Sequence, residues 1–284
     1  MTSWQQSFHA LLHPRVITML FFGFSAGIPL LLIFSSLGLW LREAGVERTA
    51  VTFFSWAALG YSFKFVWAPI VDFLPLPFLN KYLGRRRSWI FVSQIAVILS
   101  ILLMGITDPA SGNTELKIMA LAAVALGFSS ATQDIVIDAY RIESAPIKLQ
   151  ALMSSTYIAG YRIGMIISGA GSLFIASHFG SEINSYNYEA WKITYFIMAV
   201  FMLVGIATTL IINEPKEEKI ITAKYSNYTY IKFFITFLIA VFCFIGVFIS
   251  SSDISVYLKN ILADILNNNN LSYFLIELLR LFFA

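Results

Sequence analysis

The amino-acid sequence predicts an all-α, polytopic helical membrane protein. Of its 284 residues, 58% are hydrophobic and only 12% are charged, and the mean hydropathy is +0.76. A soluble domain carries about twice this charged fraction. The apolar residues also gather in long uncharged runs, and a run of about 20 residues can cross a bilayer as a helix. The chain is therefore expected to cross a membrane several times.

Seven such spans can be drawn along the chain. They cover residues 16–40, 50–71, 89–107, 118–141, 152–177, 193–212 and 231–250. We expect residues 1–212 to form a six-helix bundle and residues 213–230 to form a cytoplasmic linker. Residues 231–284 would hold the seventh span and the start of a second bundle. The last fourteen residues are apolar but too few to cross roughly 30 Å of hydrocarbon, which suggests a shortened chain.

The distribution of Lys and Arg predicts the orientation, because short cytoplasmic loops carry an excess of these residues. With the N-terminus in the cytoplasm, the inner segments carry eleven of them and the outer segments six, while two lie within spans. We therefore expect a cytoplasmic N-terminus. The single cysteine, Cys243, lies in an apolar run, so no internal disulfide is expected.

Ionisable residues inside or near the spans are candidates for function, because charge is costly in hydrocarbon. Lys64 lies in the second span, Asp134 and Asp138 in the fourth, and Arg162 in the fifth. At 100° per residue, Asp134, Asp138 and Arg141 fall within about 60° of one another on one helix face. With a rise of 1.5 Å per residue, Asp134 lies about 24 Å into its span. Lys64, Asp134 and Arg162 would meet if spans two, four and five are neighbours.

Two alternatives stay open for these charges. Asp138 and Arg141, which are expected near the cytoplasmic edge, could form a purely structural ion pair or extend to water. In the fifth span, Tyr157 and Tyr161 flank the arginine and could hydrogen-bond a sugar or carboxylate, or serve only in packing. The same span spaces Gly160, Gly164 and Ser168 four residues apart, a pattern that favours close helix packing.

Four segments carry a family resemblance: "YSFKFVWAPIVD" (61–72), "LGRRRSWIFVSQ" (83–94), "ATQDIVIDAYRIE" (131–143) and "AGYRIGMIISG" (159–169). Together they resemble the AmpG-type muropeptide permeases of the major facilitator superfamily, which are distant relatives of acetyl-CoA transporters. The resemblance covers about residues 15–212. It implies a six-plus-six helix architecture, of which this chain offers the N-terminal bundle and an incomplete C-terminal part. It also implies proton-driven import of anhydromuropeptides across the bacterial inner membrane for peptidoglycan recycling.

The confinement of these charges to spans two, four and five suggests roles for them in a proton-coupled permease. Asp134 is the first candidate for proton coupling and Asp138 the second. Lys64 and Arg162 would attract carboxylates or polar sugar groups of the substrate. Three further residues are expected in the same cavity: Arg141, Tyr157 and Tyr161.

The loop between the second and third spans matches a superfamily pattern of an Asp followed by Gly and basic residues. Asp72 fits the first position, and Gly84, Arg85, Arg86 and Arg87 fit the second. The loop is longer here than in the general pattern, so a latch between Asp72 and the arginines is in question. The alternative is that these arginines only set the topology.

Several alternatives to muropeptide import are open for this chain. The chain could be a truncated or split-gene remnant without activity, or a related permease for another anionic substrate such as an acetyl-CoA-type compound. A second polypeptide could supply the missing helices. An enzyme is not expected, because the two aspartates lie on one helix and the "DIVID" segment lacks an upstream DGxxAR partner. We expect the bilayer, a muropeptide and a proton as partners, and no cofactor, metal or nucleic acid.

Overall fold

The chain divides into two compact units, Met1–Glu218 and Lys219–Ala284. The computed structural model describes residues 10–47, 54, 57–182 and 185–215 of the first unit, and residues 251–266, 271–273, 275–276 and single positions between 232 and 250 of the second. The site candidates from the sequence all belong to the first unit.

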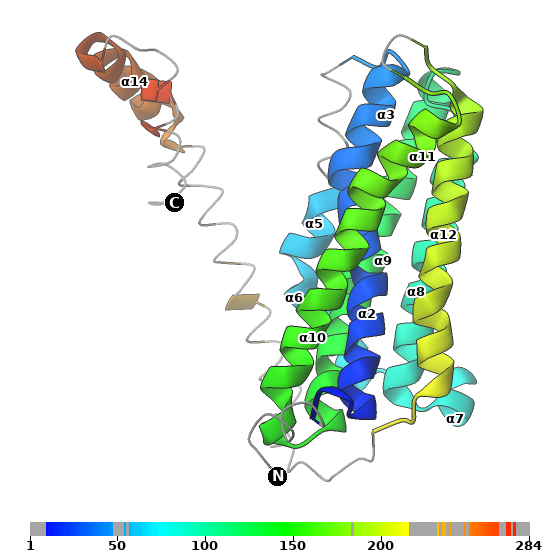
Figure 1. Ribbon diagram of the computed structural model, residues 1–284. Coiled ribbons are helices and arrows are strands. Elements are labelled where there is room, and N and C mark those ends of the chain that lie inside the picture. Colours follow the sequence, from blue (N-terminus) through cyan, green and yellow to red (C-terminus); the bar gives the residue numbers. More distant parts are fainter. Residues whose placement is uncertain are drawn as a thin grey trace, which may run out of the picture. The chain divides into compact units, whose positions relative to one another are not determined.

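The first unit is a bundle of long helices that run along a common direction (Figure 1). In chain order they are α2 (Pro14–Leu31), η1 (Leu32–Ser36), α3 (Leu37–Glu43), α5 (Ala57–Ser62), α6 (Lys64–Phe73), α7 (Leu79–Leu83), α8 (Arg85–Gly105), α9 (Asn113–Ser144), α10 (Ile147–Ile166), η3 (Ile167–Gly171), α11 (Ser172–His178) and α12 (Tyr188–Ile211). The π-helical segments η1 and η3 join their neighbours into two continuous helices of 30 and 32 residues.

Five helices of the described chain are long and apolar enough to cross a membrane. They are Pro14–Glu43, Arg85–Gly105, Asn113–Ser144, Ile147–His178 and Tyr188–Ile211. They correspond to the predicted spans one, three, four, five and six, and most begin several residues earlier. The difference arises because a helix continues into polar residues beyond the apolar core of the bilayer, where hydropathy no longer marks it.

The second span differs from the prediction of one continuous helix. Residues 50–53, 55 and 56 lie outside the described part. The remainder forms α5 and α6, which are separated at Phe63, where φ is −104° and ψ is 11°. This break lies directly before Lys64. The seventh span, 231–250, is described only at single positions, which are helical, and α14 (Ser252–Leu266) follows it in the second unit.

The closest helix pair of the bundle is α2 with α10, and glycines make this approach possible. A Cβ atom at Gly23 would fall on the backbone carbonyl of Tyr157. Gly27, Gly160 and Gly164 likewise face the backbone of the opposite helix at distances that leave no room for a methyl group. The packing face predicted in the fifth span therefore packs on the first span.

The helices of the first unit enclose two apolar cores. The helix α9 packs against α8, α5 and α6, while α12 packs against α8 and α2. One core contains the stacked rings of Trp40 and Trp191, whose centroids are 5.6 Å apart. On their outward sides α8 and α12 expose large apolar residues such as Leu99 and Val200.

Candidate functional site

Asp134 lies at the centre of a group of polar side chains contributed by three spans. The Tyr157 hydroxyl, from α10, donates a hydrogen bond to the Asp134 carboxylate on α9 at 3.0 Å. Tyr161 lies one turn further along α10, and the two tyrosine rings are 6.1 Å apart. Lys64, at the start of α6, lies within electrostatic range of the carboxylate. We call these residues, together with Tyr61, the Asp134 cluster.

The structure adds residues that the sequence analysis missed. Tyr61 donates its hydroxyl to Ser130 Oγ at 2.9 Å, one turn from Asp134. The Trp67 indole N–H donates to Thr132 Oγ1 at 3.0 Å. These bonds hold α5 and α6 against α9 on either side of the break, and Lys64 is the first residue of α6. The sequence signal that could have indicated these contacts is the pair of hydroxyl residues, Ser130 and Thr132, within the apolar run of span four.

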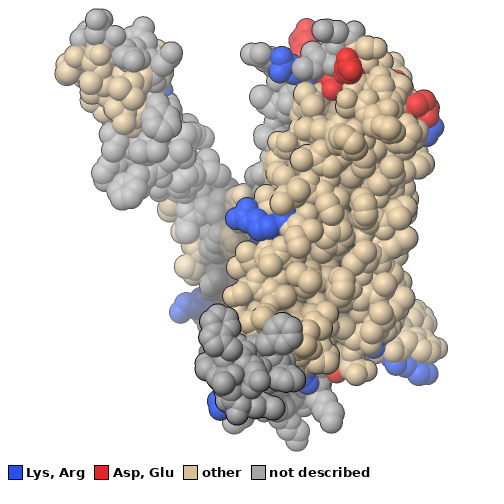
Figure 2. Space-filling model, in the orientation of Figure 1, with Lys and Arg blue, Asp and Glu red and all other residues tan. Residues whose placement is uncertain are grey.

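Arg162 is not brought into contact with Asp134. Its guanidinium is exposed, and within the described residues its one hydrogen bond is to Met165 Sδ at 3.7 Å on the same helix. The expected meeting of three charges is therefore limited to Lys64 and Asp134. Figure 2 shows that the charged side chains of this face of the unit gather mainly at its two ends. An exposed cation within a membrane span needs an anionic or polar partner.

Asp138 and Arg141 form an ion pair of 3.2 Å, three residues apart on α9. The Asp138 side chain is 51% exposed, so the pair lies at the surface of the unit. This geometry matches the structural alternative for the two residues. The described residues also contain no group of three or more His, Cys, Asp or Glu side chains placed to hold a metal ion.

Arg86 is the centre of an ion-pair network at the end of the bundle where α2 begins. Its guanidinium is 6% exposed and lies 2.6 Å from an Asp72 oxygen and 2.5 Å from a Glu143 oxygen. The Arg86 Nε atom also donates to the second Glu143 oxygen at 2.9 Å, so this contact is bidentate. Because Asp72 belongs to α6 and Glu143 to α9, the network ties three predicted spans together.

The two neighbouring arginines bind backbone carbonyls. Arg85 donates to the Asp72 carbonyl at 2.8 Å, and its guanidinium lies 3.5 Å from Glu143. Arg87 donates to two carbonyls in the last turn of α12, those of Thr209 and Leu210, at 3.0 Å each. Each of these arginines therefore makes tertiary contacts, and their role in setting the topology stays a prediction.

Glu214 closes the same end of the bundle. Its carboxylate accepts hydrogen bonds from the backbone N–H groups of Arg86 at 2.7 Å and Arg87 at 3.0 Å. An acidic group is stabilised at this position because the first N–H groups of a helix are unpaired and carry partial positive charge. Gly84, with φ of 85°, turns the chain into α8 in a conformation that favours glycine.

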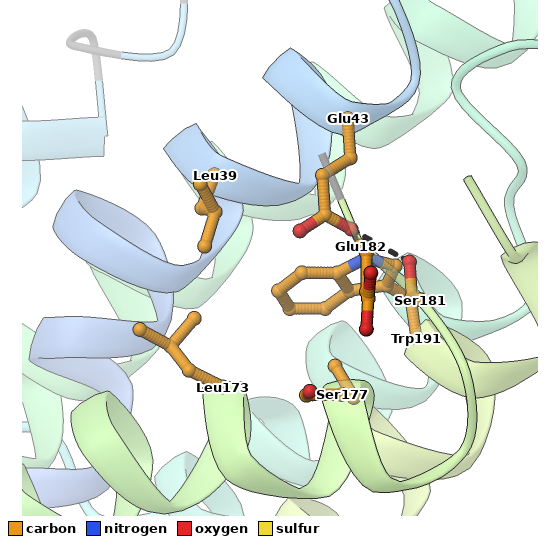
Figure 3. Close-up of a pocket in the computed structure, with 8 residues that line it drawn as sticks. Leu39, Glu43, Leu173, Ser177, Ser181, Glu182 and Trp191 are labelled. Carbon is orange, nitrogen blue, oxygen red and sulfur yellow. Dashed lines mark hydrogen bonds between the residues drawn. The ribbon is translucent and has the colours of Figure 1, made fainter. Parts of the chain in front are cut away.

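The opposite end of the bundle holds a pocket of about 390 Å³ between α3, α11 and the start of α12 (Figure 3). The Glu43 carboxylate on its wall accepts hydrogen bonds from Ser181 Oγ at 2.6 Å and from the Trp191 indole at 2.7 Å. Leu39 and Leu173 form an apolar side. The carboxylate thus anchors the loop before α12 to α3, and no residue predicted from the sequence lines this pocket.

A second set of bonds strengthens this end. The Tyr186 hydroxyl donates to Asp108 at 2.6 Å and accepts the Trp40 indole N–H at 3.2 Å. Burial, and then the hydrogen bond to Asp108, raise the pKa of Tyr186 above its usual value. The tyrosine therefore stays protonated and keeps joining the two loops throughout the physiological pH range.

Comparisons with known proteins identify the family. The model of the Major Facilitator Superfamily matches residues 8–282. The transporter candidate AmpG 4 of Rickettsia felis is 36% identical over 202 residues, which are 71% of this chain and 46% of that protein. The anhydromuropeptide permease of Escherichia coli K12 is 33% identical over 204 residues, which are 72% of this chain and 38% of the permease. The aligned part is thus less than half the length of each relative.

The motifs and the fold agree with these matches. The four segments that suggested the family lie on α5 and α6, at the start of α8, on α9 and on α10, and their polar residues form the Asp134 cluster and the Arg86 network. The predicted resemblance is confirmed. The chain belongs to the Major Facilitator Superfamily and is similar, over 71% to 72% of its length, to AmpG-type members of it.

Proposed function

We propose that this chain supplies the N-terminal bundle of a proton-coupled permease that imports anhydromuropeptides across the bacterial inner membrane for peptidoglycan recycling. The observation that best supports this proposal is the Asp134 cluster, in which a carboxylate between helices accepts a tyrosine hydrogen bond of 3.0 Å and lies within electrostatic range of a lysine. The names of the relatives supply the substrate class. We further propose that the N-terminus lies in the cytoplasm.

Asp134 is proposed as the coupling residue. When ionised, it attracts Lys64 and accepts the Tyr157 hydroxyl, so it holds α6 and α10 to α9. Protonation removes the attraction for Lys64 and weakens the hydrogen bond. One facing state would then be favoured over the other, which is the requirement for coupling in a transporter whose bundles move about a central site. Asp138 is the second candidate and is already paired with Arg141.

Arg162 is proposed as a substrate contact. Its exposed guanidinium has no carboxylate partner among the residues that the structure describes, and a muropeptide carries peptide carboxylates. Tyr157 and Tyr161 would present hydroxyl and ring surface to the sugar. A second bundle must complete such a site, and we propose that a second polypeptide provides it. A chain without that partner would be the inactive remnant of the alternative hypothesis.

The test is uptake of labelled anhydromuropeptide into proteoliposomes under an inward proton gradient. The chain is reconstituted alone and together with the C-terminal half of the E. coli permease. We expect accumulation in the second case, and we expect Asp134→Asn to remove gradient-driven accumulation while leaving substrate exchange without a gradient. Asp138→Asn tests the second candidate on the same face; because Asp138 is already paired with Arg141, we expect this variant to keep accumulation within about a factor of two.

Three results would each refute a different part of the proposal. Full gradient-driven accumulation by Asp134→Asn would remove its coupling role. Uptake of acetyl-CoA but not of the muropeptide would support the related-permease alternative. Absence of uptake in both preparations, with each protein folded and inserted, would favour the remnant.

A further inference from the structure

The short helix α7 presents a solvent-exposed aromatic face that the proposed transport function does not use. Phe78, directly before the helix, is 88% exposed, and Tyr82 is 78% exposed. Phe78 precedes the helix and Tyr82 lies within it, and the exposed Lys81 is the neighbour of Tyr82 in the sequence. Leu79 and Leu83, in contrast, are partly buried. We call Phe78, Lys81 and Tyr82 the α7 face.

This exposure does not result from a loosely attached loop. The Trp89 indole on α8 donates to the Leu74 carbonyl at 2.7 Å, which ties the start of the connection to α8. The Gly84 N–H donates to the Asn80 carbonyl at 3.1 Å at its other end. Arg85 also binds the Asp72 carbonyl. The connection is therefore tied to the bundle by the Trp89 and Arg85 bonds, while the Gly84 bond closes α7 itself, and the α7 face is held outward.

The backbone at Phe78 supports a role for its side chain. Its φ of 66° lies in the left-handed region, and within the described residues it is the one non-glycine with positive φ. This conformation costs free energy in a bulky residue, and glycine would adopt it freely. A strained residue that the surrounding structure retains is a reason to look for function at that position.

The position and chemistry of the α7 face fit a phospholipid surface. Figure 1 shows α7 lying crosswise at one end of the bundle, next to α8, whose outer side exposes apolar residues. Aromatic rings are favoured at the level of the lipid headgroups, and lysine can place its stem among acyl chains and its ammonium near phosphates. Lys81 makes no ion pair within the described chain, so its ammonium can bind a phosphate.

We propose that the α7 face inserts into the headgroup layer of the adjoining leaflet and binds phospholipid there. The rings of Phe78 and Tyr82 occupy the boundary between headgroups and acyl chains, and Lys81 contacts a lipid phosphate. Because α7 leads directly into the arginines of the Arg86 network, this contact sets the depth of that network in the membrane. The inference does not depend on the transported substrate.

Site-specific fluorescence tests the proposal in the full chain. Cys243 is replaced by Ala, and single cysteines are placed at Phe78, Tyr82 and, as the aqueous control, Ser111 in the loop before α9. Each is labelled with a nitrobenzoxadiazole dye in phospholipid vesicles. We expect the dyes at 78 and 82 to be quenched several-fold more by nitroxide lipids than by iodide, and the dye at 111 to show the reverse.

Two outcomes would overturn the inference. Quenching by iodide at 78 and 82 as strong as at 111 would place the α7 face in water. Protection from both quenchers would mean that protein covers it. Phe78→Gly provides an independent check on folding, because glycine accepts the backbone conformation. That variant should stay folded while the dye at 82 moves toward the aqueous pattern; unchanged lipid quenching at 82 would contradict anchoring by the Phe78 ring.

The role of Lys81 is tested by lipid charge. One lysine near an anionic surface contributes enough to change partitioning by about fivefold. We therefore expect added phosphatidylglycerol to increase nitroxide-lipid quenching at 82 in the Lys81 protein. Lys81→Gln should lose most of that increase. An equal response of both proteins to phosphatidylglycerol would refute the phosphate contact.

Discussion

Arg86 is a nearly buried charge, and its contribution to the stability of the fold depends on the carboxylates that pair with it. With 6% of its side chain exposed, it has lost most of its hydration, and the carboxylates of Asp72 and Glu143 replace water. Removing one partner of such a group leaves the others desolvated and uncompensated, which is why the loss is large. The neighbouring Arg85 is 30% exposed and contacts Glu143 at only 3.5 Å, where solvent screens the interaction.

This contrast predicts different effects for two alanine substitutions in adjacent positions. Arg86→Ala should reduce the free energy of unfolding by about 3–5 kcal/mol, because two carboxylates lose their cation. Arg85→Ala, the matched control, should cost about 1 kcal/mol or less. Thermal unfolding of the detergent-solubilised protein measures both. Similar midpoints for the two variants would show that burial of Arg86 contributes little.

At the same scale, the sequence could predict which residue types matter but not every partner. Asp134, Lys64 and Tyr157 were identified because charge and hydroxyl groups stand out in apolar runs, and the structure brings them together. Glu143 and Glu214 were missed as partners of Arg86. Their contacts span 57 and 128 residues, and nothing local in the sequence marks an acceptor at such separation.

At the scale of the helix, the positions of most spans could be predicted and their interruptions could not. Five spans follow from apolar runs, because hydrocarbon thickness fixes the length that hydropathy detects. The break at Phe63 has no proline or glycine at its position, so the local sequence does not predict an interruption of the helix there. The small residues of span five predict a close helix contact, but the sequence does not show that α2 is the helix they pack against.

The α2–α10 contact gives a prediction about two glycines in membrane-spanning helices. Gly160→Ala should destabilise the bundle by about 1–3 kcal/mol or more, because the added methyl group meets the Leu20 backbone, which cannot rotate away. Gly38→Ala is the matched control, since nothing lies within 4 Å of its Cβ position. Alanine is the better helix former, so this variant should gain about 0.5–1 kcal/mol.

Unfolding midpoints in detergent test this pair as well. We expect the midpoint of Gly160→Ala to fall and that of Gly38→Ala to rise or stay unchanged. A parallel loss in both variants would mean that helix propensity and not helix contact governs these positions.

At the scale of the whole first unit, charge differs between the two ends of the bundle. The end where α2 begins carries seven basic and four acidic described residues: Arg15, Lys81, Arg85, Arg86, Arg87, Arg141 and Lys148 against Asp72, Asp138, Glu143 and Glu214. The other end carries three basic and six acidic residues: Arg42, Lys117 and Lys192 against Glu43, Glu47, Asp108, Glu115, Glu182 and Glu189. Acidic side chains gather at that end in Figure 2.

This asymmetry predicts the orientation in the cell, because basic residues in short loops are retained on the cytoplasmic side. In a Cys243→Ala background, a cysteine replacing Ser111 should react with a membrane-impermeant maleimide in intact spheroplasts. A cysteine replacing Lys148 should react only after the inner membrane is permeabilised. Both positions are exposed in the structure, so access through the membrane and not burial decides the result. Labelling of the Lys148 variant in intact spheroplasts, with Ser111 protected, would reverse the proposed orientation and place the Arg86 network on the outer side.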